Sequence, residues 1–493
     1  GVYFYTDNGA NKTIVHVENN STTQTITVPS AMLPIAVDEV MQFAYDGDTG
    51  KIWFGIENVW ADNSGGTTGN PSTGANPTFT LADTSIFMTP LRDHGGVAWT
   101  GLANFGQLDN DYTAPTDFNA LSTANLPEPT ISPNADTQAD DHFNTVLYAG
   151  TGYDADGSYT QVGQDVVVGF KPDWTWIKNR DKSNHNHSLF DSSRGATKRL
   201  LSNLSNAEGT EGTALTDFDV TGGGFTLGVN NEVNQHNDNF VSWNWKANGS
   251  TTSNIAVDSV SSGVPSIAST VQANTTAGFS IVTFTGNNTN DATIGHGLGT
   301  TPAMIITKNR DDSVNWRVWH KDLQSTYVFF LASSLYSFGP SSHSNGYIKT
   351  VGSTTYSTYQ GNVDSNGVNG ASDAMVAYCF AEIEGYSKFG SYTGGGTTFP
   401  FVYLGFRPAF LIVKNADASN SWRLWDSTRN EFNLTNKYLS PDSSGVEGSI
   451  NIDVDFLSNG FKLRGSNASI NGSTNNMIYM AFAENPFKYA NAR

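Results

Sequence analysis

The sequence contains only one cysteine, Cys379. An intrachain disulfide is therefore excluded, and the fold cannot depend on a disulfide framework. Cys379 lies within the alternating apolar run MVAYCFAEI, a pattern that predicts a buried and unreactive thiol. Long apolar runs are missing as well, because no stretch reaches the ~18 residues of a membrane-spanning helix. We therefore expect no membrane insertion.

Charge is scarce, and positive charge is scarcer than negative charge. Charged residues make up 15% of the chain, compared with about 25% in an average soluble protein. The 26 Lys and Arg residues are outnumbered by 46 Asp and Glu residues, which gives a net charge of −20 at pH 7. Binding to nucleic acid or to an anionic membrane surface requires a basic face, so neither is an expected partner.

The motifs of common enzymes are absent too. The sequence has no nucleophile elbow, no phosphate-binding loop and no CxxC pair. The nearest approach to a glycosidase is NIDVDF, in which Asp453 and Asp455 would share one face of a strand, but no glutamate flanks them. We interpret this pair as a solvated strand face. The sequence thus predicts no catalytic residues, no cofactor and no enzymatic activity.

The chain does contain one sequence pattern that occurs three times. Pro172, Pro302 and Pro408 each precede an apolar run (DWTWI, AMIIT and AFLIV) that ends in Lys-Asn. Each copy then continues with an aromatic residue, a Gly-aromatic segment (GGFTL, NGYIKT, NGFKL) and a closing alternating run (FVSWNWKA, MVAYCFAE, MIYMAFAE). A repeat of about 100 residues is as long as a whole domain, not a solenoid unit. The sequence therefore predicts three tandem repeat domains.

These repeats set the expected domain organisation. Period-two alternation and Gly-rich turns predict an all-β chain of tandem β-sandwich domains, with one short helix over 194–205. The Ser/Thr/Gly-rich composition of 249–276 indicates a spacer, whereas the second and third copies lack one and are expected to pack as a rigid pair. The expected parts are a first sandwich at 1–110, a connector at 111–142, repeats at 143–248, 277–386 and 387–493, and the linker at 249–276.

Two features could bind a metal. His185 and His187 stand two apart in SNHNHSLF, followed later by His236, but the other two repeats lack them. The turns LDNDY (108–112) and YDADGS (153–158) are rich in Asp, yet they lack the length and the closing Glu of an EF-hand. We interpret the histidines as a polar loop and the aspartates as turn residues. No metal site is predicted, with calcium at the turns as the open alternative.

Two tryptophan pairs supply the candidate ligand-binding residues. In NWRVW and SWRLW the two rings of each pair fall on opposite strand faces. Trp319 and Trp425 align with Phe190 and are expected in the core, which leaves the other ring of each pair as the outward one. An exposed aromatic beside Arg is suited to stacking on a sugar. The candidates are therefore Trp316, Arg317, Trp422 and Arg423, and packing between domains is the competing interpretation.

The Lys-Asn signature also has two interpretations. In the structural one, Asn turns the chain and Lys caps a strand end or pairs with Asp181, Asp311 or Asp417. In the functional one, each repeat carries the same polar ligand site.

A family resemblance enters in the first 107 residues. The segment 39–65, EVMQFAYDGDTGKIWFGIENVWADNSG, resembles the central hairpin of a SPRY domain, and 88–107, MTPLRDHGGVAWTGLANFGQ, resembles its closing strands. The turn residues of DGDTG and the alternation of KIWFG predict a hairpin independently. The opening strands of the SPRY family have no match here, which implies an N-terminally incomplete domain and a longer parent chain.

A second resemblance covers nearly all of the rest. The stretch YTAPTDFNALSTANLPEPTI (112–131) and the unit GFKPDWTWIKNR…LFDSSRG are similar to the connector and the repeated domain of tail-fibre proteins of marine and cyanobacterial phages. The resemblance implies a virion protein on the phage tail or particle surface, outside the cell and facing the host. It implies a homo-oligomer, for which we expect a trimer, together with other virion proteins as partners and host surface carbohydrate as a possible one.

Three functional hypotheses follow. The first is a non-enzymatic tail fibre or adhesin that contacts host surface glycans or proteins. The second is a purely architectural virion surface or decoration protein that makes no receptor contact. The third is a polysaccharide depolymerase, which requires two carboxylates about 5–10 Å apart in a groove.

Overall fold

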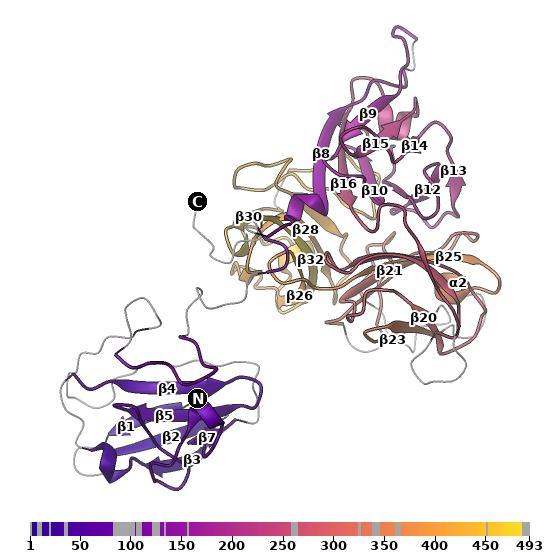
Figure 1. Ribbon diagram of the computed structural model, residues 1–493. Coiled ribbons are helices and arrows are strands. Elements are labelled where there is room, and N and C mark those ends of the chain that lie inside the picture. The colour runs from indigo at the N-terminus through magenta and orange to yellow at the C-terminus, as the bar shows by residue number, and fades with distance from the viewer. Residues whose placement is uncertain are drawn as a thin grey trace. The chain divides into compact units, whose positions relative to one another are not determined.

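The computed structural model describes residues 2–6, 12–18, 21–33, 38–81, 104, 111–120, 129–132, 135–154, 157–257, 265–323, 327–337, 346–359, 366–449 and 452–485. The chain forms two compact units, 1–127 and 128–493. Both are built of antiparallel sheets, so the prediction of an all-β chain of sandwiches is confirmed (Figure 1). Within the described residues, no helix has the length and apolarity needed to cross a membrane.

The first unit contains the predicted hairpin. Met41–Asp46 pairs with Lys51–Ile56, and the turn closes with a 2.8 Å hydrogen bond from Gly50 N–H to the Asp46 carbonyl. Gly50 has φ +70°, a left-handed conformation that favours glycine. The elements are β1 (Val2–Thr6), β2 (Lys12–Glu18), β3 (Ser21–Thr27), η1 (Ser30–Met32), β4 (Met41–Asp46), β5 (Lys51–Ile56), β6 (Val59–Trp60), η2 (Pro71–Thr73) and β7 (Phe79–Thr80). The segment 88–107 lies outside the described residues except for Asn104.

The first repeat is a two-sheet sandwich. Its large sheet has the order β13-β12-β11-β10-β16-β8 and its small sheet the order β14-β15-β9. The elements are η4 (Ala139–Asp141), β8 (Phe143–Ala149), β9 (Gln164–Val167), β10 (Trp174–Asn179), β11 (Ser188–Asp191), β12 (Lys198–Leu201), β13 (Gly209–Thr210), β14 (Leu215–Asp217), β15 (Gly224–Leu227), α1 (Asn231–Asn234) and β16 (Asn239–Trp245). The helix predicted over 194–205 is wrong, because Lys198–Leu201 is a strand that pairs with β11 and β13 and buries Leu200.

The second repeat has the same plan. Its large sheet has the order β17-β18-β19-β25-β21-β22 and its small sheet β20-β24-β23. The elements are β17 (Ser253–Ile255), β18 (Ser269–Asn274), β19 (Phe279–Thr285), β20 (Ala292–Gly295), β21 (Met304–Asn309), β22 (Arg317–His320), β23 (Tyr347–Val351), β24 (Thr355–Tyr359), α2 (Asn366–Asn369) and β25 (Ala374–Phe380). The segment 249–276, expected to be a linker, thus supplies two strands, β17 and β18, to this sheet.

The third repeat has the same two-sheet architecture, with fewer strands in its large sheet. Its large sheet has the order β26-β32-β28-β29 and its small sheet β27-β31-β30. The elements are β26 (Ser387–Thr393), β27 (Phe401–Tyr403), β28 (Arg407–Asn415), β29 (Arg423–Asp426), β30 (Val454–Leu457), β31 (Gly460–Leu463), α3 (Ala468–Asn471) and β32 (Asn476–Asn485). By sheet order, the strand equivalent to GGFTL and NGFKL in the second repeat is β24, so the alignment on NGYIKT was wrong.

The central strands of the large sheets are buried on both faces. In β25, Met375, Ala377 and Cys379 point into the core between the two sheets of their own repeat, while Tyr378 and Phe380 belong to a second core. Cys379 is fully buried, as predicted, and burial raises the pKa of its thiol. The alternation along each central strand therefore separates two apolar environments rather than core from solvent.

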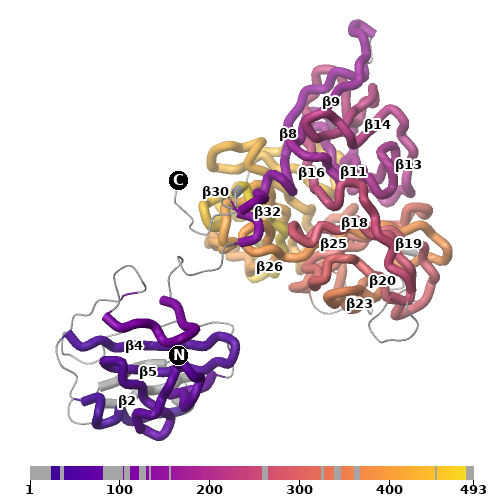
Figure 2. The backbone as a smooth tube through the Cα atoms, in the orientation of Figure 1, coloured from indigo at the N-terminus to yellow at the C-terminus, as the bar shows by residue number. Residues whose placement is uncertain are grey.

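The second core is shared by all three repeats. The ring of Phe482, from the third repeat, lies 5.2 Å from that of Phe143 and 5.8 Å from that of Trp245, both in the first repeat. It also lies 6.2 Å from the ring of Phe380 in the second repeat. Figures 1 and 2 show the three repeats as lobes that meet at this centre. The repeats thus form one body with a common aromatic core.

Candidate functional site

The Lys-Asn signature forms the same turn in every repeat. Taking Lys308 as the example, its Nζ donates to the carbonyls of Asn309 and Asp312 at 2.5 and 3.0 Å. The Asn309 side-chain oxygen accepts from the N–H groups of Asp311 and Asp312, both at 2.9 Å. Asp311 in turn accepts from the N–H of Ala374 at 2.6 Å, which ties the turn to β25. The equivalent residues of the other repeats do the same, so the structural interpretation holds.

These buried lysines give stability a distinctive pH dependence. Burial lowers the pKa of Lys178 and Lys414 to about 8 and that of Lys308 to about 7, from 10.5. The unfolded chain therefore binds more protons than the folded one between these values and 10.5. The free energy of unfolding should rise as the pH increases from 7 to 9, by up to about 1.4 kcal/mol per pH unit for each lysine. Urea unfolding at several pH values, followed by tryptophan fluorescence, measures this slope.

A matched pair of variants isolates the lysine contribution. Lys308→Met should reduce the rise in the free energy of unfolding with pH. Lys171→Met, at a side chain that is 32% exposed, should leave that rise unchanged. A wild-type slope that is zero or negative over this range would contradict the assignment.

The three repeats join one another head to tail in a closed ring. The N–H of Glu208, in the first repeat, donates to the Arg310 carbonyl of the second at 2.7 Å. The corresponding bonds run from Ser337 of the second repeat to Ala416 of the third (2.9 Å) and from Glu447 of the third to Arg180 of the first (3.0 Å). The same positions are used each time, so the repeats are related by an approximate threefold rotation.

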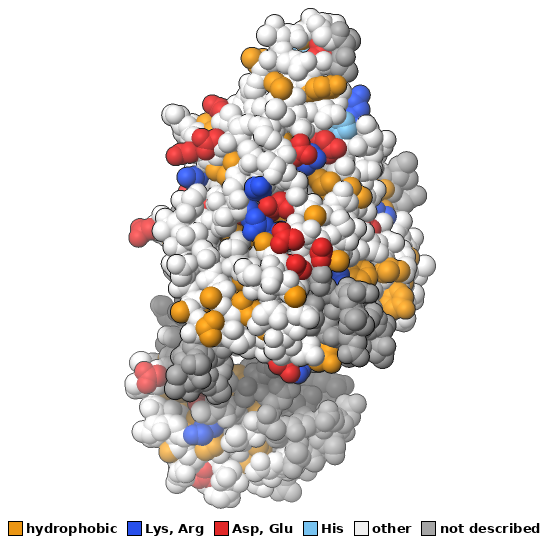
Figure 3. Space-filling view, turned by 90° about the vertical axis from the view of Figure 1, so that its right-hand side faces the viewer, with side chains coloured by type: hydrophobic (Ala, Val, Ile, Leu, Met, Phe, Trp, Pro, Cys, Tyr) orange, Lys and Arg blue, Asp and Glu red, His pale blue; other side chains and the backbone are white. Residues whose placement is uncertain are grey.

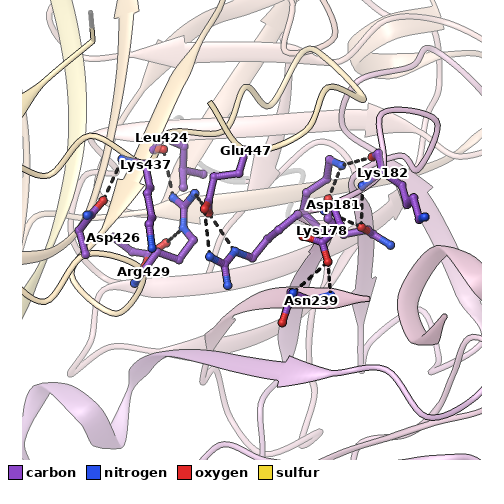
Figure 4. A network of polar contacts seen from close by, with 12 residues as sticks. Lys178, Asp181, Lys182, Asn239, Leu424, Asp426, Arg429, Lys437 and Glu447 are labelled. Carbon is purple, nitrogen blue, oxygen red and sulfur yellow. Dashed lines mark hydrogen bonds and ion pairs between the residues drawn. The ribbon is translucent and has the colours of Figure 1, made fainter. Parts of the chain in front are cut away.

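The seam between the first and third repeats contains a network of buried and half-buried charges (Figure 4). Arg180 binds both carboxylate oxygens of Glu447 at 2.9 and 3.0 Å. Glu447 also accepts from Arg429 at 3.2 Å, and Arg429 donates to Asp426 at 2.6 Å. Although burial opposes its ionisation, the hydrogen bond from Arg180 and the charge of Arg429 hold the pKa of Glu447 below its usual value. Asp426 completes the seam by accepting from Trp243 Nε1 at 3.0 Å.

The seam between the first and second repeats has the same chemistry. Arg310 binds both oxygens of Glu208 at 2.8 and 2.9 Å, and Glu208 accepts from Arg194 at 2.8 Å. Arg194 also pairs with Asp191, whose carboxylate accepts from the Tyr378 hydroxyl at 2.6 Å. Sequence analysis missed this role, although the identical spacing of DSSR and DSTR in two copies was a usable signal.

In the part of the chain that the structure describes, the seam between the second and third repeats lacks the Asp–Arg–Glu network of the other two, although Lys388 of the third repeat pairs with Glu382 of the second at 2.8 Å. His320 and Leu323 take the positions of the Asp and Arg, and His320 Nε2 lies 3.1 Å from the Tyr479 carbonyl. Ala416 and Ser337 replace the Arg–Glu pair, and the Ser337 hydroxyl donates to the Ala416 carbonyl at 2.7 Å. The second and third repeats are directly joined in sequence, and their contacts combine apolar packing with hydrogen bonds, among them one from Lys414 Nζ to the Ser334 carbonyl at 3.2 Å.

Trp316 and Trp422 do not face solvent, contrary to the expectation for ligand stacking. Their exposures are 0% and 1%. Trp316 Nε1 donates to the Leu201 carbonyl of the first repeat at 2.9 Å, and Trp422 Nε1 donates to the Phe330 carbonyl of the second at 3.2 Å. The competing interpretation, packing between repeats, describes both. Strand alternation correctly assigned Trp316 and Trp422 to the strand face that points out of their own sandwich. That face is covered by the neighbouring repeat.

The two neighbouring arginines, Arg317 and Arg423, also form contacts within the protein. The Arg317 guanidinium lies 4.5 Å from the Phe330 ring centroid and donates to the Asn315 carbonyl at 2.8 Å. That of Arg423 lies 4.9 Å from the Tyr438 ring centroid. Neither side chain is free for a ligand in this arrangement.

The comparisons with known proteins place the three repeats in a family. A family model described as a domain of unknown function, DUF7483, matches residues 138–486. The chain belongs to this family. The match spans all three repeats and falls within the second compact unit. Neither the curated proteins nor the solved structures include a significant match to the chain.

The histidines of the DUF7483 region that were considered as metal ligands, and interpreted as a polar loop, do not come together around one point. His187 Nδ1 accepts from Trp176 Nε1 at 2.9 Å, His185 Nδ1 lies 3.1 Å from Asn179 Nδ2, and the His236 ring packs against the Tyr159 ring in a tilted arrangement. Among the described residues, no group of three His, Cys, Asp or Glu side chains could hold a metal ion. Residues 108–110 and 155–156 of the two Asp-rich turns lie outside the described residues.

The DUF7483 region does expose aromatic side chains elsewhere. Phe401 and Tyr403 on β27 are 44% and 65% exposed, and Phe399, just before the strand, is 41% exposed. The inward residues Val402 and Leu404 are buried in the core. This row was not singled out from the sequence, although the alternation FPFVYL carries it.

Proposed function

We propose that the chain is a structural protein of a bacteriophage virion, a tail fibre or adhesin that reaches the host surface without catalysing a reaction. Its sequence resembles such proteins in the connector and in the repeated unit. The observation that carries the proposal is the closed ring of three repeats around one aromatic core. A virion surface protein needs a rigid body that resists unfolding and proteolysis, and a shared core with paired charges at two seams provides one.

The surface composition suits an extracellular particle. Charged side chains are sparse, and on the face seen in Figure 3 several basic and acidic ones lie side by side. The partners under this proposal are other virion proteins, further copies of the chain, for which a trimer is proposed, and host surface carbohydrate. No nucleic-acid or membrane contact is part of it.

A purely architectural role is the second candidate. The burial of Trp316 and Trp422 favours it, because it removes the ligand-binding residues that the sequence suggested. A depolymerase gains no support from Asp453 and Asp455. Asp455 is buried and forms an ion pair with Arg464 at 2.5 Å, so it is already neutralised by a partner.

Competition with phage adsorption tests the proposal. The purified chain should bind the bacterium that the phage infects, saturably, and should reduce adsorption of the intact phage. Binding should fall when surface polysaccharide is stripped from the cells. Saturable binding without competition would contradict the tail-fibre role, and no binding before or after stripping would leave the architectural candidate.

A further inference from the structure

The outer face of the small sheet in the third repeat carries aromatic, basic and acidic side chains on neighbouring strands. Strand β27 presents the aromatic row of Phe399, Phe401 and Tyr403. Strand register places Lys462 opposite Phe401 and Gly460 opposite Tyr403 on the neighbouring strand β31. Successive rings on one strand face stand about 6.6 Å apart, given a rise of about 3.3 Å per residue.

A charged strip borders the aromatic row. Lys462 faces Asp455 on β30, and the N–H of Arg464 donates to the Asp453 carbonyl just beyond the strand pair. The Arg464 and Asp455 side chains form an ion pair. Two cations and two carboxylates thus sum to zero on a chain whose net charge is −20. The face offers hydrogen-bond donors and acceptors without the net negative charge of the rest of the molecule.

The aromatic row is partly held in place before any ligand arrives. A Cβ built on Gly460 would lie 3.1 Å from two ring atoms of Phe401, so this ring lies over the glycine. Glycine at this position leaves space that a larger residue would fill. Ordering the ring in advance reduces the entropy lost on binding.

The sandwich itself does not require aromatic residues here. At the position of Tyr403 the first repeat has Val167 and the second has Gly295, as the pairing of β9 and β20 shows. At the position of Phe401 they have Asp165 and Thr293. All three repeats fold on the same plan, so the row in the third repeat is not explained by packing.

We propose that this face, formed by Phe399, Phe401, Tyr403, Lys462 and Arg464, binds an uncharged polysaccharide chain. Exposed rings stack on the apolar faces of successive sugar rings, and the adjoining charged strip hydrogen-bonds their hydroxyl groups. The charge balance selects neutral over acidic polysaccharides, because the chain as a whole repels polyanions. This inference rests on the proposed adhesin role and names the ligand class and the surface.

Affinity electrophoresis of the full chain in gels containing a polysaccharide tests the inference. The probes are the neutral polysaccharides dextran, mannan and laminarin, with alginate as the acidic comparison. At least one neutral polymer should retard the wild type. Phe401→Ala/Tyr403→Ala should weaken that retardation at least tenfold. Val167→Ala, at the equivalent position of the first repeat, should leave it unchanged.

Several outcomes would overturn the inference. Retardation by none of the neutral polymers, retardation by alginate alone, or equal retardation of the wild type and the double variant would each do so. A concentration-dependent dimer abolished by the double variant, measured by sedimentation, would instead assign the face to a second copy of the chain. Host-cell binding that persists in the double variant would refute this surface while leaving the adhesin role intact, whereas a wild type that binds no cells refutes the adhesin role itself.

Discussion

Asp426→Asn is expected to destabilise residues 128–493 by about 3–5 kcal/mol, the usual cost of breaking a buried ion pair. Asp426 and Arg429 are both fully buried, and Asp426 accepts a hydrogen bond from Trp243 of the first repeat. The substitution preserves shape but removes the charge that compensates Arg429. Chemical unfolding followed by tryptophan fluorescence measures the loss.

The second repeat supplies the control for this experiment. It places His320 and Leu323 where the third repeat has Asp426 and Arg429. The double variant Asp426→His/Arg429→Leu should therefore recover a large part of the stability lost by Asp426→Asn. Equal stability of the wild type and Asp426→Asn would show that the network contributes little.

Phe482→Ala should weaken all three repeats together. Its ring contacts aromatic rings of the first and second repeats as well as those of its own. Removing a buried phenyl ring costs about 3–5 kcal/mol, and here the cavity opens where the repeats meet. Hydrogen exchange should increase in β10, β21 and β28 alike, because all three strands contribute side chains to the core that Phe482 fills.

Ile348→Ala is the matched comparison. Ile348 is buried in the core between the two sheets of the second repeat only. Its loss should raise hydrogen exchange chiefly in that repeat. If Phe482→Ala changed exchange only in the third repeat, the three would be independent domains.

The sequence predicted local structure better than assembly. Alternation and turn chemistry identified the hairpin at Asp46–Lys51 and the central strands of each repeat, and they offered a structural role for Lys-Asn, because these depend on residues close in the chain. It also placed the two rings of each Trp pair on opposite faces. What covers each face depends on contacts between positions more than a hundred residues apart, as for Trp316 and Leu201, and no local pattern encodes these.

One signal did point to the ring. The runs DWTWI, AMIIT and AFLIV contain few polar residues between the apolar ones, which is typical of strands buried on both faces. If the three repeats were separate domains without mutual contacts, Trp174 and Trp176 would be exposed to water. The Ser/Thr-rich composition of 249–276 hid strands β17 and β18. Strand β17 lies at the edge of its sheet and is largely exposed, and edge strands tolerate polar side chains.

The direct peptide link between the second and third repeats, and the covalent continuity of all three, have a consequence for assembly. A ring of separate subunits dissociates on dilution, because its formation depends on concentration. Here closure is a first-order event within one molecule, governed by the effective concentration that the linking segments impose. The ring would therefore persist at any dilution of the chain.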